Sequence, residues 1–456
     1  MREDPLGHGG WSRGKELLKR HVFDAYREES AFAGRWPVAE AATVPVAMPK
    51  ARFRRERFGG FGYQSLNDQR TRLWPFDFRV LVLIDGRRDR AEILGALQHQ
   101  DLGLDDLEAH LDETLARLIQ GNLLRWSDIR KDGRTITVEN YEEVCTDPDR
   151  LSTPLVVLWE PSLECNMRCR FCYSESGPGC GGGGHEDARV REFVDSGVFQ
   201  VTLLGGEPLV HPRFAELVHG LEDGGIGVEF VTNGWLLTEK NLNLIADETN
   251  ICQLMVSIDA TAEVHDDIRG TPGAFARAIK GVHRFSEAGF EVTVTSTLTR
   301  KTAHTLPDLI DAVADSGARR MKIRPLALLG RGSGQCADEG MTLADIERYH
   351  VDLRRKAEEV SDRLAIVHSM PATEPGLCAC DYNPTKPGAI TGSGGTCGIG
   401  RMMAYVRHDG GVAPTSTMRD EVVGFLGPRS FLDIWCDETW KRIRPVNRAG
   451  YGILNV

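Results

Sequence analysis

Residues 165–172 read Cys-Asn-Met-Arg-Cys-Arg-Phe-Cys, so three cysteines are separated by three and then by two residues. Three thiolates on one short loop can hold three irons of an iron–sulfur cube, whereas the usual closed cluster has four cysteine ligands. The remaining iron is then open to another ligand, just as an open position distinguishes catalytic from structural zinc. The spacing therefore predicts a reactive iron–sulfur cluster held by Cys165, Cys169 and Cys172.

The segment before the cysteines predicts where this cluster lies in the fold. Residues 155–159, Leu-Val-Val-Leu-Trp, form an apolar run typical of a buried parallel strand. The cysteine loop would then follow the carboxyl end of a strand, where α/β barrels place their chemistry. A zinc knuckle or scattered core cysteines is the alternative. Zinc would need a fourth ligand, for which Cys180 in the glycine-rich run 177–184 is the candidate.

Residues 200–330 alternate between strand-like and helix-like segments, which indicates βα units and a parallel sheet. With the strand before the cysteines, the segments make about six repeats. The expected strands are Gln200–Leu204, Val228–Thr232, Leu254–Ile258, Val292–Thr297 and Arg320–Arg324, and the expected helices are Arg213–Glu222, Glu239–Asp247, Gly273–Ala288 and Leu306–Ser316.

Short polar motifs follow these strands. The motifs are Gly205-Gly206-Glu207-Pro208, Thr232-Asn233-Gly234, Ser257-Ile258-Asp259, His265-Asp266-Asp267-Ile268-Arg269-Gly270 and Arg324-Pro325-Leu326. Paired glycines let the backbone approach a ligand closely. Each motif alone could be an ordinary βα turn, because glycine and proline occur in most loops. Arg269 alone could be an exposed surface arginine.

Taken in order, these motifs resemble those of the radical S-adenosylmethionine (radical SAM) enzymes over residues 153–335. That family has the same cysteine spacing, with an aromatic residue before the last cysteine, here Phe171. The resemblance implies a partial (βα)6 barrel, a [4Fe-4S] cluster and S-adenosylmethionine as cofactor. It implies reductive cleavage of that cofactor to a 5′-deoxyadenosyl radical, with an electron donor such as a flavodoxin or ferredoxin.

The resemblance also implies roles for individual residues. Gly205, Gly206, Glu207 and Pro208 would hold the methionine amino group. Arg269 would fork onto the cofactor's carboxylate, a geometry that guanidinium favours. The further cofactor contacts would be Phe171, Asn233, Asp259 and Ser257, the last of these at the ribose. The residues that quench the substrate radical are unknown from the sequence.

Composition limits the rest of the chain. Its 456 residues are 41% hydrophobic and 27% charged, as in ordinary globular proteins, and suggest two or three domains. No apolar run reaches the roughly 18 residues of a membrane span. A net charge of −11 opposes nucleic-acid binding. Eleven cysteines with three in a cluster, and no signal-peptide core, predict a cytoplasmic protein.

A second module is expected at 50–128, after a tail and linker at 1–49. Small strands, three helices and a returning strand at 123–126 suggest a winged helix–turn–helix, whose usual ligand is DNA. The third helix, Leu104–Gln120, opposes DNA because it carries five acidic residues and one arginine: Asp105, Asp106, Glu108, Asp112, Glu113 and Arg117.

This module instead resembles the peptide-recognition element of ribosomal-peptide maturases, which is similar to the pyrroloquinoline-quinone peptide chaperone. In that element a leader peptide adds a strand to the sheet edge beside the third helix. The acidic helix predicts a leader with basic and apolar residues. Phe58, Phe61, Tyr63 and Trp74 are either anchors for the leader or core residues of a small domain.

Residues 336–456 resemble a degenerate SPASM extension, which in its family binds one or two auxiliary clusters. Cys397 and Gly410 match its pattern, but Thr415 stands at the position of the second cysteine. Cys378, Cys380, Cys397 and Cys436 could still form an auxiliary Fe-S cluster, although their spacing fits no known pattern.

The sequence thus predicts an α/β radical SAM peptide maturase with a barrel at 150–335. The module at 50–128 would bind the leader of a ribosomally made precursor peptide, and the barrel would abstract hydrogen from a core residue. The outcome could be a crosslink, epimerisation or decarboxylation. The alternative is a radical SAM enzyme for a small-molecule metabolite or cofactor precursor. No nucleic acid or membrane partner is expected.

Overall fold

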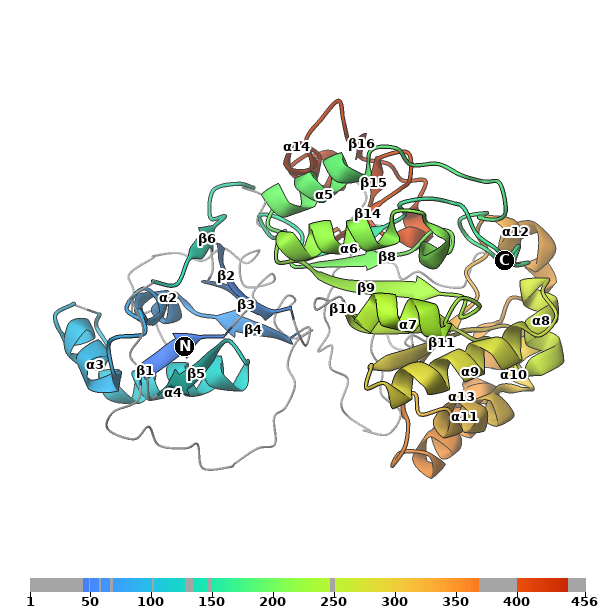
Figure 1. The fold of residues 1–456 in the computed structure, drawn as a ribbon, viewed down its shortest axis with the longest axis horizontal. Helices are drawn as coiled ribbons and strands as arrows, with labels where there is room; N and C mark the ends of the chain where they lie inside the picture. The colour runs from blue at the N-terminus through green and yellow to red at the C-terminus, as the bar shows by residue number, and fades with distance from the viewer. Residues whose placement is uncertain are drawn as a thin grey trace. The chain divides into compact units, whose positions relative to one another are not determined.

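The computed structural model describes residues 44–48, 50–56, 59–65, 69–100, 102–127, 135–145, 150–246, 251–368 and 400–441. They form two compact units, one within residues 1–153 and one within 154–456 (Figure 1). In these ranges no helix has both the length and the apolar character needed to cross a bilayer.

The first unit combines a small sheet with three helices. Its four-stranded sheet has the order β4-β3-β2-β6, and a separate antiparallel pair joins β1 to β5. The strands are β1 (Val44–Ala47), β2 (Ala51–Glu56), β3 (Gly59–Gln64), β4 (Gln69–Leu73), β5 (Leu124–Ser127) and β6 (Val138–Asn140), and the helices are α2 (Pro75–Leu81), α3 (Arg90–Gln98) and α4 (Leu107–Gln120). The strands β1 and β6 lie outside the range 50–128 expected for the module.

Local sequence signals explain the starts of these helices. Pro75 opens α2, where a missing N–H costs nothing. Asp89 caps α3 by accepting from Glu92 N at 2.9 Å, and Glu92 accepts in return from Asp89 N. Of the four aromatic residues expected as anchors or core, Phe61 and Tyr63 are buried and Trp74 is 37% exposed. Phe58 lies outside the described residues.

Two acidic side chains of α4 are paired with an arginine of the neighbouring helix α3. Glu108 and Asp112 both pair with Arg90 of α3, the former at 2.9 Å. Arg117 makes two bonds to the buried Asp77 of α2, at 2.6 and 2.8 Å. Two of the five acidic residues counted for this segment are thus paired with a cation, and the basic character of a leader stays a prediction.

The second unit is built on one ten-stranded sheet with the order β13-β12-β11-β10-β9-β8-β7-β14-β15-β16. Strands β7 to β13 are parallel, and β14 pairs parallel with β7 before an antiparallel turn to β15. The strands are β7 (Val156–Trp159), β8 (Gln200–Leu203), β9 (Gly227–Thr232), β10 (Ile251–Ser257), β11 (Val292–Leu298), β12 (Arg320–Pro325), β13 (Ala365–His368), β14 (Met403–Val406), β15 (Gly411–Ala413) and β16 (Gly424–Phe425). The predicted α/β class is confirmed, and the sheet extends beyond the six expected strands on both sides.

Ten helices are described in the second unit, and most of them pack on the outer face of this sheet (Figure 1). They are α5 (Glu186–Asp195), α6 (Phe214–Asp223), α7 (Glu239–Ala246), α8 (Ala262–Arg269), α9 (Ala274–Glu287), α10 (Arg300–Ala303), α11 (Leu306–Asp315), α12 (Arg331–Gln335), α13 (Leu343–Glu359) and α14 (Phe431–Trp435), with short 3-10 turns η1 (Pro208–Val210), η2 (Ala337–Glu339) and η4 (Ser416–Met418). Phe230 of β9 contacts Phe214 of α6, with ring centres 5.4 Å apart. Alternate strand residues therefore form the core on this side, and the residues between them lie on the opposite, inner face.

The C-terminal segment supplies β14, β15 and β16. Gly410 has a φ of +87° in the turn between β14 and β15, and Thr415 is buried where η4 begins. Cys436 follows α14 as its C-cap. Cys378, Cys380 and Cys397 lie outside the described residues, so an auxiliary cluster in this extension stays a prediction.

Candidate active site

The three cysteines lie on the loop that leaves β7, as the sequence predicts. Cys165 and Cys169 are buried, Cys172 is half-buried, and none of them forms a disulfide. Burial raises the pKa of the Cys165 thiol to about 12 and also raises that of Cys169. Buried thiols of this kind become thiolates when a metal replaces the proton.

Each of the three sulfurs has a polar hydrogen donor or hydroxyl close by. Met167 N lies 3.5 Å from Cys165 Sγ, Arg269 Nη1 donates to Cys169 Sγ at 3.5 Å, and the Ser174 hydroxyl is 3.4 Å from Cys172 Sγ. Such donors stabilise negatively charged sulfur and tune iron–sulfur clusters. The donor set therefore fits a cluster held by three thiolates. Among the described residues, no group of three His, Cys, Asp or Glu side chains, the three loop cysteines included, is arranged around a single ion.

The turn after β8 packs directly against the cysteine loop. Gly206 N donates to Ser162 O and Glu207 N donates to Glu164 O, both at 2.9 Å. A Cβ on Gly206 would lie 1.9 Å from Glu164 O, and Gly205 has a φ of +97°. The two glycines are thus required for close contact between the two loops.

Glu207 joins this turn to the end of β9. Thr232 Oγ1 donates to Glu207 Oε1, and Asn233 N donates to Glu207 Oε2, both at 2.7 Å. Burial outweighs these bonds and raises the pKa of Glu207 to about 7. A nearby cation would favour the charged form of this carboxyl, which suits the expected position of an amino group.

This shift predicts how stability depends on pH in the protein without cofactors. The pKa of Glu207 rises from 4.5 to about 7 on folding, so the folded chain binds more protons between those values and loses stability as pH rises through them. Glu207→Gln, which cannot ionise, should therefore gain on the wild type by several degrees in unfolding midpoint between pH 5 and pH 8. Thermal unfolding of both proteins across this range measures the gain. A constant difference at all pH values would contradict the assignment.

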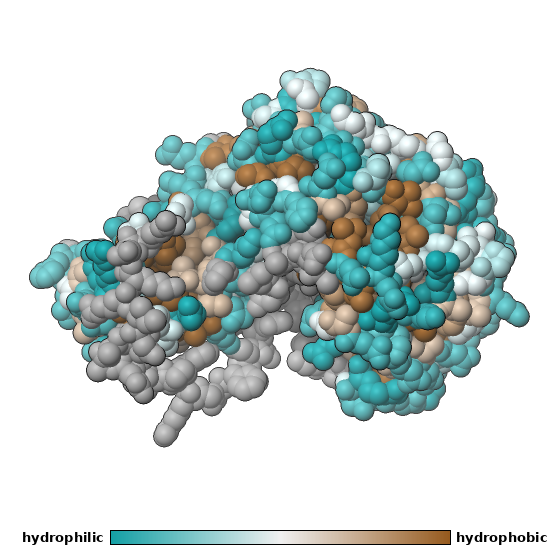
Figure 2. Space-filling view, viewed as in Figure 1, coloured by the Kyte–Doolittle hydropathy of each residue, from teal (hydrophilic) through white to brown (hydrophobic). Residues whose placement is uncertain are grey.

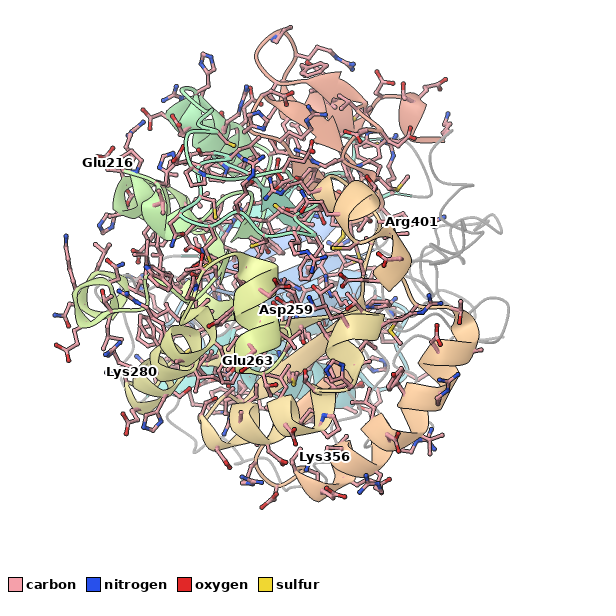
Figure 3. All side chains as sticks on the ribbon, turned by 90° about the vertical axis from the view of Figure 1, so that its right-hand side faces the viewer. Glu216, Asp259, Glu263, Lys280, Lys356 and Arg401 are labelled. Carbon is pink, nitrogen blue, oxygen red and sulfur yellow. The ribbon has the colours of Figure 1, made fainter. Side chains whose placement is uncertain are left out.

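The side chain of Arg269, predicted to bind the cofactor's carboxylate, is bonded to other groups of the protein. Its Nη2 is bonded to the Asp259 carboxylate and donates to Ser257 O at 3.1 Å, and its Nη1 faces Cys169. Asp259, labelled in Figure 3 near α8, also accepts from Thr297 N at 3.0 Å. One nitrogen of the guanidinium predicted to bind the cofactor's carboxylate, Nη2, is thus bonded to Asp259, and Nη1 is bonded to Cys169. Only the buried Nε of Arg269 has no acceptor among the described residues, and a ligand could supply one.

The other expected cofactor residues lie at the same end of the sheet. Asn233 Nδ2 bonds Asn166 Oδ1 at 2.8 Å and thereby joins β9 to the cysteine loop. Ser257 Oγ lies 3.4 Å from Thr295 Oγ1 and is partly exposed on the inner face. Pro208 is buried at the start of η1, and Phe171 is half-buried, with the backbone of Gly332 packed against it. The fold therefore brings the predicted residues of four motifs to one region.

Two residues that hold the cysteine loop were not expected from the sequence. Arg331 donates from Nε to Cys169 O at 2.8 Å and from Nη2 to Ser176 O at 2.7 Å. Glu164 accepts from Gly179 N and Gly181 N, each at 3.0 Å, and these two bonds lower its pKa. The glycine-rich run 177–184 is thus bonded to the cysteine loop.

Comparison with known proteins agrees with the family resemblance inferred from the motifs. Residues 159–313 match the radical SAM superfamily. Mycofactocin maturase MftC of Mycobacterium ulcerans (strain Agy99) is 30% identical over 297 residues, covering 64% of this chain and 75% of that protein. AdoMet-dependent heme synthase of Methanosarcina barkeri (strain Fusaro / DSM 804) is 31% identical over 202 residues, covering 43% of this chain and 57% of that protein.

Among solved structures, Streptococcus suis SuiB bound to precursor peptide SuiA superposes with a TM-score of 0.62 at 16% identity. The match covers 88% of this chain and 90% of SuiB. At this identity the likeness concerns the fold, and it extends well beyond the barrel.

Proposed function

The chain belongs to the radical SAM superfamily, and we propose that it is a maturase that binds the leader of a precursor peptide and removes hydrogen from a core residue. It is an enzyme that uses a [4Fe-4S] cluster and S-adenosylmethionine. The observation that carries the proposal is that the cysteine loop, Glu207 and Arg269 come together in one unit, while the other unit has a small sheet with an edge strand. The similarity to MftC and the fold shared with peptide-bound SuiB support it.

Different residues of the barrel would hold the cluster and S-adenosylmethionine. Cys165, Cys169 and Cys172 would hold three irons, and Glu207 would accept from the methionine amino group. Bound together, the cofactors supply one-electron chemistry that takes a hydrogen atom from the substrate. The protein's own contribution is positioning, since the cofactors carry the difficult chemistry.

Strand β4 is the edge at which a leader would add. It ends the strand order of its sheet within the described part of the chain. Leu73 O points toward β3, because a Cβ on Gly59 would lie 2.4 Å from it. Residues alternate along a strand, so the backbone groups of Arg70 and Arg72 point away from β3. Arg117 of α4 donates to Arg72 O at 2.9 Å, which places α4 beside this edge.

A proline at position 70 tests strand addition directly. Arg70→Pro removes a backbone N–H on the side of β4 that faces away from β3. We expect the full-length variant to bind the precursor peptide at least about tenfold more weakly, because backbone bonds supply the affinity of strand addition. Calorimetry with the peptide encoded beside the gene measures this.

Arg70→Ala is the matched control, because it removes the same side chain and keeps the N–H. It should bind within about threefold of wild type, as expected of a charge at the rim of an interface. Equal loss in both variants would mean that the arginine side chain, rather than the strand edge, carries the binding. No loss in either would remove β4 from the binding site.

A small-molecule substrate is the second candidate. The heme synthase of M. barkeri is 31% identical to this chain over 202 residues, although the match covers only 57% of that protein. Incubation of the reconstituted chain with either a precursor peptide or an iron porphyrin, followed by mass spectrometry of both, separates the two functions.

A further inference from the structure

Glu160 lies where β7 leads into the cysteine loop, and none of its side chain is exposed. Its backbone N–H donates to Val406 O at 2.9 Å, so the contact with β14 continues beyond the end of β7. A buried carboxylate is costly unless it is paired with a cation and hydrogen-bonded. The partners of Glu160 therefore indicate what holds this part of the chain in place.

Both ion contacts of Glu160 within the described part of the chain come from the C-terminal segment. Arg419 Nη2 donates to Glu160 Oε2 at 3.2 Å, and His408 Nδ1 is 3.9 Å from the same oxygen. Arg419 directly follows η4, and His408 lies in the turn between β14 and β15. Burial, and then the charges of Tyr173 and Glu160, raise the pKa of Tyr405 in β14, so this phenol keeps its proton near the carboxylate. The C-terminal segment thus places three polar side chains around one buried carboxylate.

Glu160 also packs against the turn predicted to hold S-adenosylmethionine. A Cβ added to Gly205 would lie 3.0 Å from Glu160 Cβ and 3.2 Å from its Cγ. On the same turn, Ser174 Oγ donates to Gly205 O at 3.2 Å, and this hydroxyl is 3.4 Å from Cys172 Sγ. Glu160 therefore connects the C-terminal segment to the turn, and the turn in its own right contacts a residue beside one of the cluster cysteines.

The turn needs such a connection because its two glycines have no side chains that could fix it, and Gly205 has a φ of +97°. Another ion pair of the C-terminal segment, between Arg429 and Asp437 at 2.9 Å, leaves the arginine 39% exposed. Figure 2 shows, on the face in view, hydrophobic residues only in small separate groups among hydrophilic ones, and an ion pair at such a solvated surface contributes little. Breaking a buried pair has a much larger effect, because one charge is left without a partner.

We propose that the buried Glu160–Arg419 pair positions the Gly205–Pro208 turn for S-adenosylmethionine, so that the C-terminal segment contributes to cofactor binding through this pair. Glu160 and Arg419 are positioning residues, since they act through the turn. The inference goes beyond the proposed function, because it holds for a peptide substrate and for a small molecule alike.

Arg419→Gln in the reconstituted full-length protein tests the proposal. Without its cation the buried Glu160 is left unpaired, and we expect its side chain to lose its fixed position against Gly205. Hydrogen exchange followed by mass spectrometry should show that the fragment containing Gly206 and Glu207 loses at least about tenfold in protection. Equilibrium dialysis should show S-adenosylmethionine bound at least about tenfold more weakly, with unchanged iron content.

Three further variants make the test specific. Arg419→Lys keeps the positive charge and should bind S-adenosylmethionine within about threefold of wild type. Glu160→Asp keeps the negative charge but shortens the side chain, and it should lose about as much as Arg419→Gln. Arg429→Gln is the matched control, because it removes an arginine of the same segment whose ion pair is at the surface, and it should change neither measurement. Glu160→Asp carries the test if Arg419→Gln does not fold.

Exchange in α11 distinguishes a local effect from a general loss of stability. Faster exchange in α11 as well as in the turn, or an equal loss in Arg429→Gln, would mean that the pair only stabilises the fold and would contradict the proposal. Wild-type affinity and exchange in Arg419→Gln or in Glu160→Asp would contradict it too, as would a change in only one of the two measurements. Neither measurement uses a peptide, so failure here would leave the proposed function standing.

Discussion

Replacing Cys165, Cys169 or Cys172 by alanine is expected to abolish cofactor cleavage in each case. Reconstituted wild-type protein should bind about four irons per chain, and each variant should bind fewer than about one. The reason is that each iron of the cube takes its own thiolate, so two cysteines leave a second iron open and the cluster is lost. Iron analysis and the release of 5′-deoxyadenosine measure the two effects.

Cys180→Ala is the control for this series. Cys180 is exposed and lies in the glycine-rich run bonded to the cysteine loop, so its replacement should leave iron content and cleavage unchanged. Loss of metal in this variant would favour the zinc alternative, in which Cys180 is the fourth ligand. Cleavage that persists without all three loop cysteines would exclude the assigned site.

Removal of the first unit is the second large effect. A chain lacking residues 1–153 should modify a precursor peptide at least about 100-fold more slowly, because a tethered leader raises the local concentration of the core segment by this order. Cleavage of S-adenosylmethionine without peptide should change by less than about twofold, since the cysteines and the Gly205–Pro208 turn lie in the other unit. Liquid chromatography with mass spectrometry measures both products in one reaction.

This deletion has two outcomes that contradict the account. Equal peptide modification by the truncated chain would remove leader recognition from the first unit. Loss of cofactor cleavage would mean that the second unit does not function alone, and Arg70→Pro in the full-length chain would then carry the test of leader binding.

The positions of the main motifs could be predicted because each follows from nearby sequence. The cysteine spacing, the paired glycines before Glu207 and the strand runs are local signals, and the carboxyl ends of parallel strands meet at one edge. The starts of α2 at Pro75 and of α3 after Asp89 likewise follow from local signals.

The partners of those residues could not be predicted from the sequence. Arg331 bonds the carbonyl of Cys169 across 162 positions, and no spacing rule relates them. Arg269 lies in the expected place, but its bond to Asp259 depends on how α8 leaves β10. Glu108 and Asp112 are two acidic residues of α4 in the sequence, and only the packing of α3 against α4 brings Arg90 to them.

The extent of the sheet was missed for a similar reason. The pairing of β14 with β7 joins residues 403–406 to residues 156–159, and neither segment signals the other. Local pattern gives the type of an element more readily than its neighbours in a sheet.

Deuterium transfer tests the central claim most directly. The reconstituted full-length protein is incubated with S-adenosylmethionine, a reductant and the neighbouring precursor peptide carrying deuterium throughout its core segment. If the chain is a peptide maturase, deuterium should appear in 5′-deoxyadenosine and the peptide should change in mass at a core residue. Unlabelled 5′-deoxyadenosine together with an unchanged peptide would contradict the claim.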